Sequence, residues 1–125
     1  MGNREYTDSF EDLDVWQHSL RLSVNIYKIT RSFPKDELYG LTSQMRRAAN
    51  SISANIAEGY GRRNKAEKAQ FYKVAYGSLL EVKSFIYLSE KLSFIDEAGT
   101  KDILSGIVTI QKELNALIRS MASNV

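Results

Sequence analysis

Four stretches of this sequence place an apolar residue at every third or fourth position, and only short connections separate one stretch from the next. The first runs from about Leu13 to Ser32, the second begins near Asp36, the third opens at Asn64 and the fourth follows Asp96. This period is that of helices with one apolar side. Connections of about three to six residues force consecutive helices to lie antiparallel. The sequence therefore predicts an all-α fold, an antiparallel up-down-up-down four-helix bundle.

The ends of two of these helices are marked by residues with strong local preferences. Gly59 is expected to stop the second helix by adopting the left-handed conformation. Asn64 is expected to cap the third helix, and Glu67 follows at the spacing of a capping box. On the inner side of the second helix we expect Leu38, Leu41, Met45, Ala48, Ala49, Ile52 and Ile56. On that of the third we expect Phe71, Val74, Ala75, Ser78, Val82, Phe85 and Leu92. On that of the fourth we expect Ile103, Ile107, Ile110, Leu114, Leu117 and Met121.

A chain of 125 residues is long enough for one hydrophobic core but not for two. We expect residues 13–123 to form a single domain, and the acidic residues 1–12 to be poorly ordered or to serve an interface. The chain has no cysteine, which suits a reducing compartment. No apolar run approaches the roughly 18 residues of a membrane span, and the N-terminus has no apolar signal segment. These features predict a cytoplasmic protein that makes no membrane contact.

The inventory of reactive side chains argues against catalysis. The chain has no cysteine and one histidine, His18, so it supplies neither a Cys/His pair nor the histidines that a di-metal site in a helical bundle needs. Gly59-Tyr60-Gly61 resembles a phosphate-binding loop only superficially, because it lacks the Gly-Lys-Ser/Thr ending. We therefore expect no enzymatic activity, no metal and no cofactor.

Three polar residues are expected to form a structural network between helices. Glu81 falls close to the expected inner side of the third helix, where a carboxylate must be paired or protonated. Arg47 is a plausible partner, and Ser78 offers a nearby hydroxyl. An ion pair that sets helix register is favoured over a catalytic acid. Asn55 is expected to be partly buried and hydrogen-bonded, with a subunit contact as the alternative.

Small residues occur almost all round the second helix, where they allow another helix to approach closely, either within the bundle or from a second subunit. The first helix has a second apolar stripe beside its inner one. We favour a homo-oligomer on these two grounds. The small residues of the second helix are Ala48, Ala49, Ser51, Ser53, Ala54 and Ala57. The inner stripe of the first helix is Val15, Leu22, Ile26, Ile29 and Phe33, and its second stripe is Trp16, Leu20 and Tyr27.

Positive charge is concentrated in the middle of the chain. Residues 44–73 contain seven Lys and Arg against two Glu, whereas the whole chain has a net charge of +2. In the connection that follows Gly59, the dipoles of the preceding and following helices act on cations in opposite directions, so folding alone gives weak grounds for a cluster there. One interpretation is a solvated turn or a contact with a neighbouring chain; the other is binding of a phosphate backbone. The predicted nucleic-acid-binding residues are Arg46, Arg47, Arg62, Arg63, Lys65 and Lys68.

The predicted partner is RNA or single-stranded nucleic acid. No aromatic platform is evident beside these cations, so the expected base specificity is weak. The alternative function is a protein-protein scaffold whose basic turn serves subunit or partner contacts.

Several motifs carry a resemblance to a known family. They are Asp14-Val15-Trp16-Gln17, Glu37-Leu38-Tyr39-Gly40-Leu41-Thr42-Ser43-Gln44, Arg46-Arg47-Ala48, Asn55-Ile56-Ala57-Glu58-Gly59-Tyr60-Gly61-Arg62 and Gly77-Ser78-Leu79-Leu80-Glu81. In order and spacing, from about Leu13 to Leu92, the chain resembles the four-helix bundle proteins first noticed as reading frames in intervening sequences of bacterial 23S ribosomal RNA genes.

This resemblance implies an antiparallel bundle that assembles as a homopentamer, a ring with a central opening. The related accessory protein of diversity-generating retroelements is basic and binds nucleic acid and its reverse transcriptase. The family itself implies no established enzymatic activity and no settled biochemical role. The present sequence is only slightly basic, in contrast to the retroelement protein.

Overall fold

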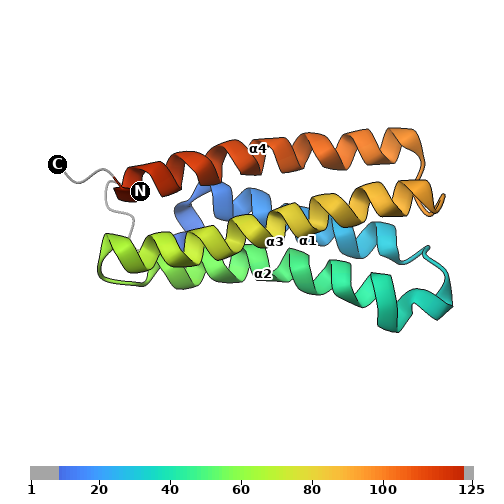
Figure 1. Cartoon of the computed structure of the whole chain (residues 1–125), viewed down its shortest axis with the longest axis horizontal. Helices are drawn as coiled ribbons and strands as arrows, with labels where there is room; N and C mark the ends of the chain where they lie inside the picture. Colours follow the sequence, from blue (N-terminus) through green and yellow to red (C-terminus); the bar gives the residue numbers. More distant parts are fainter. Residues whose placement is uncertain (1–8, 123–125) are drawn as a thin grey trace, which may run out of the picture.

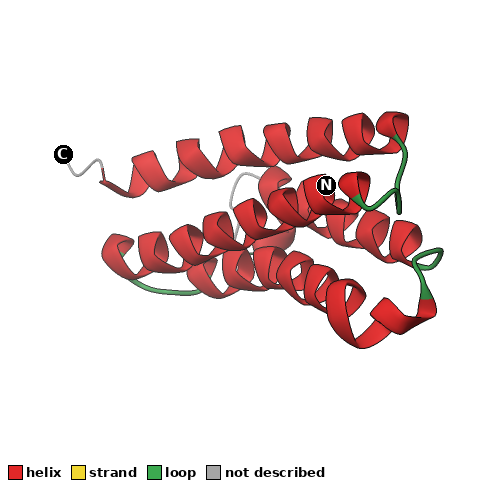
Figure 2. Cartoon of the chain, turned by 45° about the vertical axis from the view of Figure 1, so that its right-hand side comes forward, coloured by secondary structure: helices red, strands yellow, loops and turns green. Residues whose placement is uncertain are grey.

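Four α-helices lie side by side and alternate in direction in the computed structural model, which describes residues 9–122 (Figure 1). They are α1 (Asp14–Thr30), α2 (Ser43–Tyr60), α3 (Lys65–Lys91) and α4 (Glu97–Ala122). Each helix packs against its two neighbours, so that α1 and α4 also meet. No strand occurs among the described residues (Figure 2). The predicted all-α class with four helices is confirmed.

The N-terminal part of the structure is short. Of the acidic segment predicted at residues 1–12, residues 1–8 lie outside the described residues, and Phe10–Asp12 form a 3₁₀ turn before α1. Within the described residues, no helix combines the length and the apolar character needed to cross a membrane.

The core runs along the common axis of the four helices. In α4 the predicted inner residues Ile103, Ile107, Ile110 and Leu114 are all buried. Burial of each such side chain contributes about 1.5–3 kcal/mol relative to leaving it exposed. The other fully buried large side chains are Ile26, Met45, Ile52, Ile56, Tyr72, Leu79, Val82 and Ile86.

The predicted inner side of α3 is confirmed at Ala75 and Val82, which are buried, and is displaced by about one residue elsewhere. Tyr72, Leu79 and Ile86 are buried, whereas Val74 is 53% exposed and Leu92 is 46% exposed. This helix is flanked by both α2 and α4 and carries apolar residues on more than one side. The spacing of the apolar residues in α3 therefore did not distinguish the side that faces the core from the adjacent side.

The start of the second helix also differs from the prediction. A 3₁₀ turn at Lys35–Glu37 and a π-helix at Leu38–Thr42 precede α2, which begins at Ser43 rather than near Asp36. Gly40 lies in this segment with φ −117° and ψ −111°, outside the helical range. The interruption turns Leu38 outward, to 45% exposure, instead of into the core.

Gly59 does not end α2. The helix continues to Tyr60, and no glycine among the described residues has a positive φ. A Cβ at position 59 would lie 2.9 Å from Phe71 Cβ and 2.9 Å from Tyr72 Cε1, closer than carbon atoms pack. The glycine therefore serves the close approach of α3 to α2 and not a left-handed helix stop.

The predicted cap of the third helix is confirmed. The Asn64 side chain accepts a hydrogen bond from the Glu67 backbone N–H at 2.8 Å. At the other end of α3, Ser93 takes the left-handed conformation, with φ 65°. Phe94 N–H donates to Ser89 O at 2.8 Å, the hydrogen bond of a Schellman motif.

Candidate nucleic-acid interface

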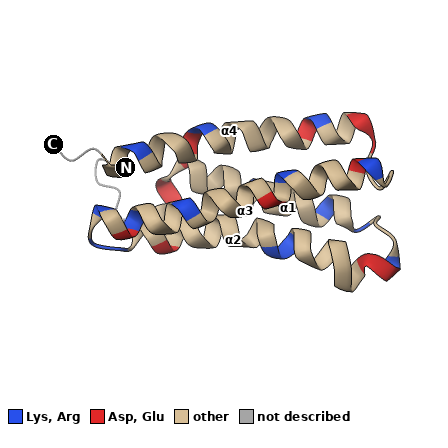
Figure 3. Ribbon diagram, in the orientation of Figure 1, with Lys and Arg blue, Asp and Glu red and all other residues tan. Residues whose placement is uncertain are grey.

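The six cations predicted to bind nucleic acid form two groups and not one patch. Arg46 and Arg47 lie in the first turn of α2, and the other four lie beyond its end or in the first turn of α3. At 1.5 Å of rise per residue, roughly 20 Å of helix separates the two groups. Figure 3 shows one group midway along the bundle and the other at the α2–α3 connection.

Arg46 is engaged within the chain. Its Cζ lies 4.6 Å from the centroid of the Tyr27 ring, and its Nε donates a hydrogen bond to Thr30 Oγ1 at 2.9 Å. The Thr30 hydroxyl in turn donates to Ile26 O at 2.7 Å. Arg46 therefore joins the start of α2 to the last turns of α1.

Arg62 and Lys68 are engaged in the same way. The Arg62 guanidinium lies 2.6 Å from Glu58 Oε2 and stacks 4.6 Å from the Phe71 ring. Lys68 Nζ donates to Tyr60 O at 2.7 Å, where a cation suits the negative end of the α2 dipole. The expectation that folding gives weak grounds for the cations in the connection after Gly59 was wrong for Arg62, because Glu58 and the Phe71 ring hold it.

Of the six predicted cations, two arginines are exposed without such contacts. Among the described residues, Arg47 and Arg63 form no hydrogen bond, ion pair or ring contact. Lys65 is also exposed. The side chains best placed to receive a phosphate group are therefore Arg47 near the start of α2 and Arg63 just beyond its end.

An aromatic side chain that the sequence did not point to lies beside Arg47. Tyr39 is 92% exposed, the highest value among the large apolar side chains described. It borders a surface cavity of about 390 Å³, which we call the Tyr39 cavity. The one signal in the sequence was Gly40, which interrupts the helix at this place. The cavity is lined by Tyr27, Leu38, Tyr39, Ser43, Arg46, Arg47 and Asn50.

Of the predicted polar network, Asn55 and Ser78 come together at Ser51. Asn55 Nδ2 donates to Ser51 O at 2.7 Å and lies 3.0 Å from Ser51 Oγ. Ser78 Oγ donates to the same Ser51 Oγ at 2.8 Å. This hydroxyl pair links α2 to α3.

Glu81 does not take part in the network and does not face the core. It is exposed, and within the described residues it has no ion pair with Arg47. The two side chains line one open surface cavity of about 420 Å³. The expectation failed because the buried side of α3 lies one residue away from the predicted one.

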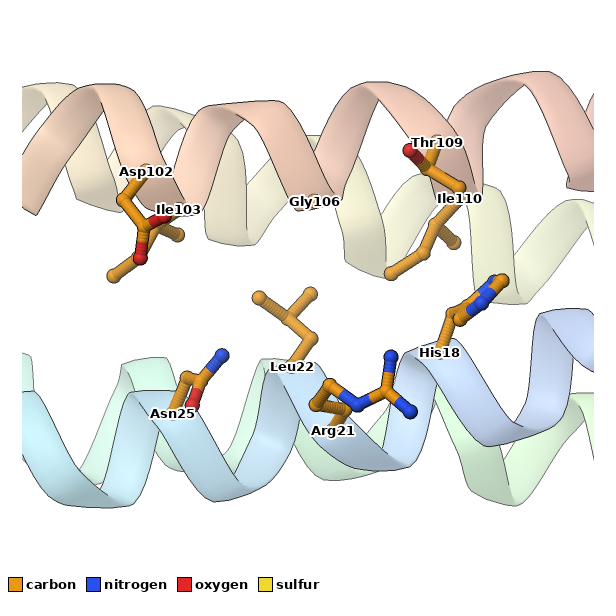
Figure 4. A pocket seen from close by; sticks show the side chains of 9 residues that line it. All are labelled: His18, Arg21, Leu22, Asn25, Asp102, Ile103, Gly106, Thr109 and Ile110. Carbon is orange, nitrogen blue, oxygen red and sulfur yellow. The ribbon is translucent and has the colours of Figure 1, made fainter.

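The single histidine lies between α1 and α4. His18 Nδ1 is 2.9 Å from both carboxylate oxygens of Glu113. Next to this pair is a small cavity of about 190 Å³ whose lining includes His18 and Gly106. In Figure 4, Asn25 of α1 and Asp102 of α4 reach into the gap between the two helices. His18 thus contacts a carboxylate across a helix interface.

A comparison with family profiles shows the family of the chain. The profile of the 23S rRNA-intervening sequence protein family matches residues 11–116. No curated protein matches the chain. A solved structure that the chain resembles is a protein of unknown function from the S23 ribosomal protein family of Bacteroides thetaiotaomicron. It shares 22% identity with a TM-score of 0.78, over 84% of this chain and 95% of the other, and it shows the same fold. Because the family profile covers well over half of its residues, the chain belongs to the 23S rRNA-intervening sequence protein family.

Proposed function

We propose that the protein is a non-enzymatic module that binds RNA or single-stranded nucleic acid. The observation that carries this proposal is the exposure of Arg47 and Arg63, which have no partner among the described residues, near the two ends of one helix. An arginine guanidinium binds phosphate oxygens through two parallel hydrogen bonds. Roughly 20 Å of helix lies between the two arginines, so a bound strand has to span several phosphates to reach both.

The other predicted cations contribute positive charge rather than direct contacts with phosphate groups. Arg46, Arg62 and Lys68 are held by partners of the same chain, so they would have to give up those contacts to bind a phosphate. They still add to the positive potential around α2, which attracts a polyanion. The proposal therefore predicts modest affinity that falls moderately as the salt concentration rises.

Fluorescence anisotropy with a labelled single-stranded RNA at about 50 mM and about 200 mM salt tests the proposal, since two phosphate contacts predict a loss of affinity of about sevenfold over this range. Replacing Arg47 and Arg63 together by Ala should reduce the salt slope by about 1.4, or about 0.7 for each lost phosphate contact. Arg119→Ala, an exposed arginine of α4, is the matched control. Absence of binding at micromolar protein in low salt would contradict the proposal.

We also propose that the protein self-associates through the outer side of α1 and α2. Leu20 and Val24 of α1 are 41% and 47% exposed. On α2, which packs against α1, Ala54 is exposed. Apolar residues of one helix thus adjoin small residues of the next, which suits close packing of a second copy.

The assembly that we propose is the homopentameric ring that the family resemblance implies. Light scattering should then give five times the 14.2 kDa mass of one chain. Val24→Glu should reduce the mass, because a charge cannot be buried in an apolar interface without a partner. Val108→Glu, on α4 and 41% exposed, should not. A monomer for the unaltered protein would remove this proposal.

The alternative function, a protein-protein scaffold whose basic turn serves subunit or partner contacts, makes a different prediction. Arg63→Glu would then break the oligomer while circular dichroism showed unchanged helicity. Under the nucleic-acid proposal the same change lowers RNA affinity and leaves the mass unchanged.

A further inference from the structure

The segment between α1 and α2 holds Tyr39 out into solvent. The Glu37 carboxylate accepts a hydrogen bond from Leu41 N–H at 3.1 Å, which closes the irregular turn around Gly40. A Cβ at position 40 would lie 3.0 Å from Glu37 Oε1, so glycine leaves room for this contact. The turn directs the tyrosine away from the core that its neighbour Leu41 enters.

Part of the lining of the Tyr39 cavity is ordered by hydrogen bonds. Asn50 Nδ2 donates to Tyr27 Oη at 3.0 Å, and Arg46 is held over the Tyr27 ring by its bond to Thr30. Arg47 also lines the cavity and has no partner among the described residues. The ordered part of the lining loses less conformational entropy when a ligand enters, whereas Tyr39 and Arg47 become ordered on binding.

The chemistry of the lining is selective for an anion with a flat apolar part. Two arginines and no Asp or Glu border the cavity. Its volume of about 390 Å³ falls within the roughly 300–1,000 Å³ of small-ligand sites. An exposed aromatic ring next to arginine is the pairing that single-stranded nucleic-acid sites use, the ring for a base and the cation for its phosphate.

We infer that the Tyr39 cavity binds one unpaired nucleotide of a bound RNA strand, with its base stacked on the Tyr39 ring and its phosphate on Arg47. This inference rests on the proposed binding of nucleic acid. It adds the position of one nucleotide site and a preference for unpaired RNA. Bases within a duplex cannot present their faces to a side chain, so the site distinguishes unpaired from paired RNA. The base preference remains weak, because every base has a face that stacks.

The test uses a labelled single-stranded RNA of ten nucleotides and the same sequence annealed to its complement, both measured by anisotropy at low salt. The unaltered protein should bind the single strand more tightly. Tyr39→Ala should weaken binding of the single strand by about tenfold, the effect of one lost stacking contact, and leave binding of the duplex unchanged. Tyr39→Phe should retain full affinity. Tyr87→Ala, an exposed tyrosine of α3 outside the cavity, is the control.

Two variants of Arg47 test its contact with the phosphate group. Arg47→Ala should weaken binding and reduce the salt slope, whereas Arg47→Lys should retain most of the slope because the charge remains. A ten-nucleotide RNA backbone that is abasic at every position should bind the Tyr39→Ala variant and the unaltered protein with nearly equal affinity, because it offers no base to stack.

The outcomes separate this inference from the proposal beneath it. If the unaltered protein binds RNA, and Arg47→Ala lowers the affinity while Tyr39→Ala does not, nucleic-acid binding stands and the stacking site is overturned. If no RNA binds in low salt, both fail. If Tyr39→Ala lowers the oligomer mass in light scattering and weakens single-stranded and duplex RNA equally, Tyr39 is a contact with a second copy and the stacking site is overturned.

Discussion

Gly59 of α2 lies directly against Tyr72 of α3, so that a Cβ at position 59 would be 2.9 Å from Tyr72 Cε1. Tyr72 is buried at this contact, with 1% of its surface exposed. Neither a backbone nor a buried ring yields easily to an added carbon atom. The closeness of α2 and α3 near the basic connection therefore depends on this glycine.

Replacing Gly59 by Ala should lower the free energy of unfolding by about 1–3 kcal/mol, the usual effect of overpacking. Urea denaturation followed by circular dichroism measures the change. The control is Gly106→Ala in α4, where an added Cβ meets nothing within 4 Å. That change should raise stability by about 0.5–1 kcal/mol, since alanine favours the helix over glycine. Equal effects of the two changes would contradict the close approach.

Ser93→Gly should stabilise the protein by up to about 1 kcal/mol, because Ser93 has a φ of 65°. Glycine avoids the roughly 1–2 kcal/mol that a side chain costs in this conformation, and the greater entropy of glycine in the unfolded chain offsets about 0.5–1 kcal/mol of that gain. Thermal unfolding measures the gain. Ser105→Gly, at an exposed position inside α4, is the matched control and should destabilise by about 0.5 kcal/mol through lost helix propensity. A loss of stability in the first variant would show that the α3–α4 turn does not have this geometry.

Tyr72 should contribute to loss of stability at alkaline pH. Burial, and next the nearby Tyr60, raise the pKa of the Tyr72 phenol above its ordinary value of 10.0. The unfolded chain therefore releases this proton first, so stability is complete below about pH 10 and falls as the pH rises beyond it.

Tyr72→Phe should remove this part of the decline and change stability little at neutral pH. Urea midpoints between about pH 8 and pH 11 measure it across the titration of the phenol. Tyr87→Phe, at an exposed tyrosine, should leave the decline unchanged. The same decline in both variants would place its origin elsewhere.

The hydroxyl groups of Ser51 and Ser78 should show coupling in a double-mutant cycle. They are 2.8 Å apart and join α2 to α3. Each single change to Ala should cost about 0.5–1.5 kcal/mol, the net contribution of a typical hydrogen bond, and the double change should cost less than the sum. The control is a cycle that combines Ser78→Ala with Thr109→Ala, at an exposed residue of α4. The two losses of stability should add.

Where the predictions from sequence succeeded, the deciding interactions were local. The inner residues of α4 from Ile103 to Leu114 are buried, and Asn64 caps α3 as expected. A helical period with one apolar side and a cap three residues from its donor involve only neighbouring residues. Such features need no knowledge of the other helices.

Where the predictions failed, the deciding group belonged to another helix. The inner side of α3 was misplaced because two neighbours share its apolar surface, and Glu81 was placed in the core for the same reason. Gly59 was given a role in its own helix, although the reason for it lies on α3.

The sequence by itself determined the four helices, most of their limits and the family of the chain, because periodicity, capping residues and motifs act over a few neighbouring positions. Only the tertiary structure decided which cations are engaged. Tyr27 and Thr30 of α1 hold Arg46, and Phe71 of α3 covers Arg62, whereas Arg47 and Arg63 meet no partner in the described chain. Such partners are distant along the chain, so the charge that remains for a ligand depends on how the helices pack.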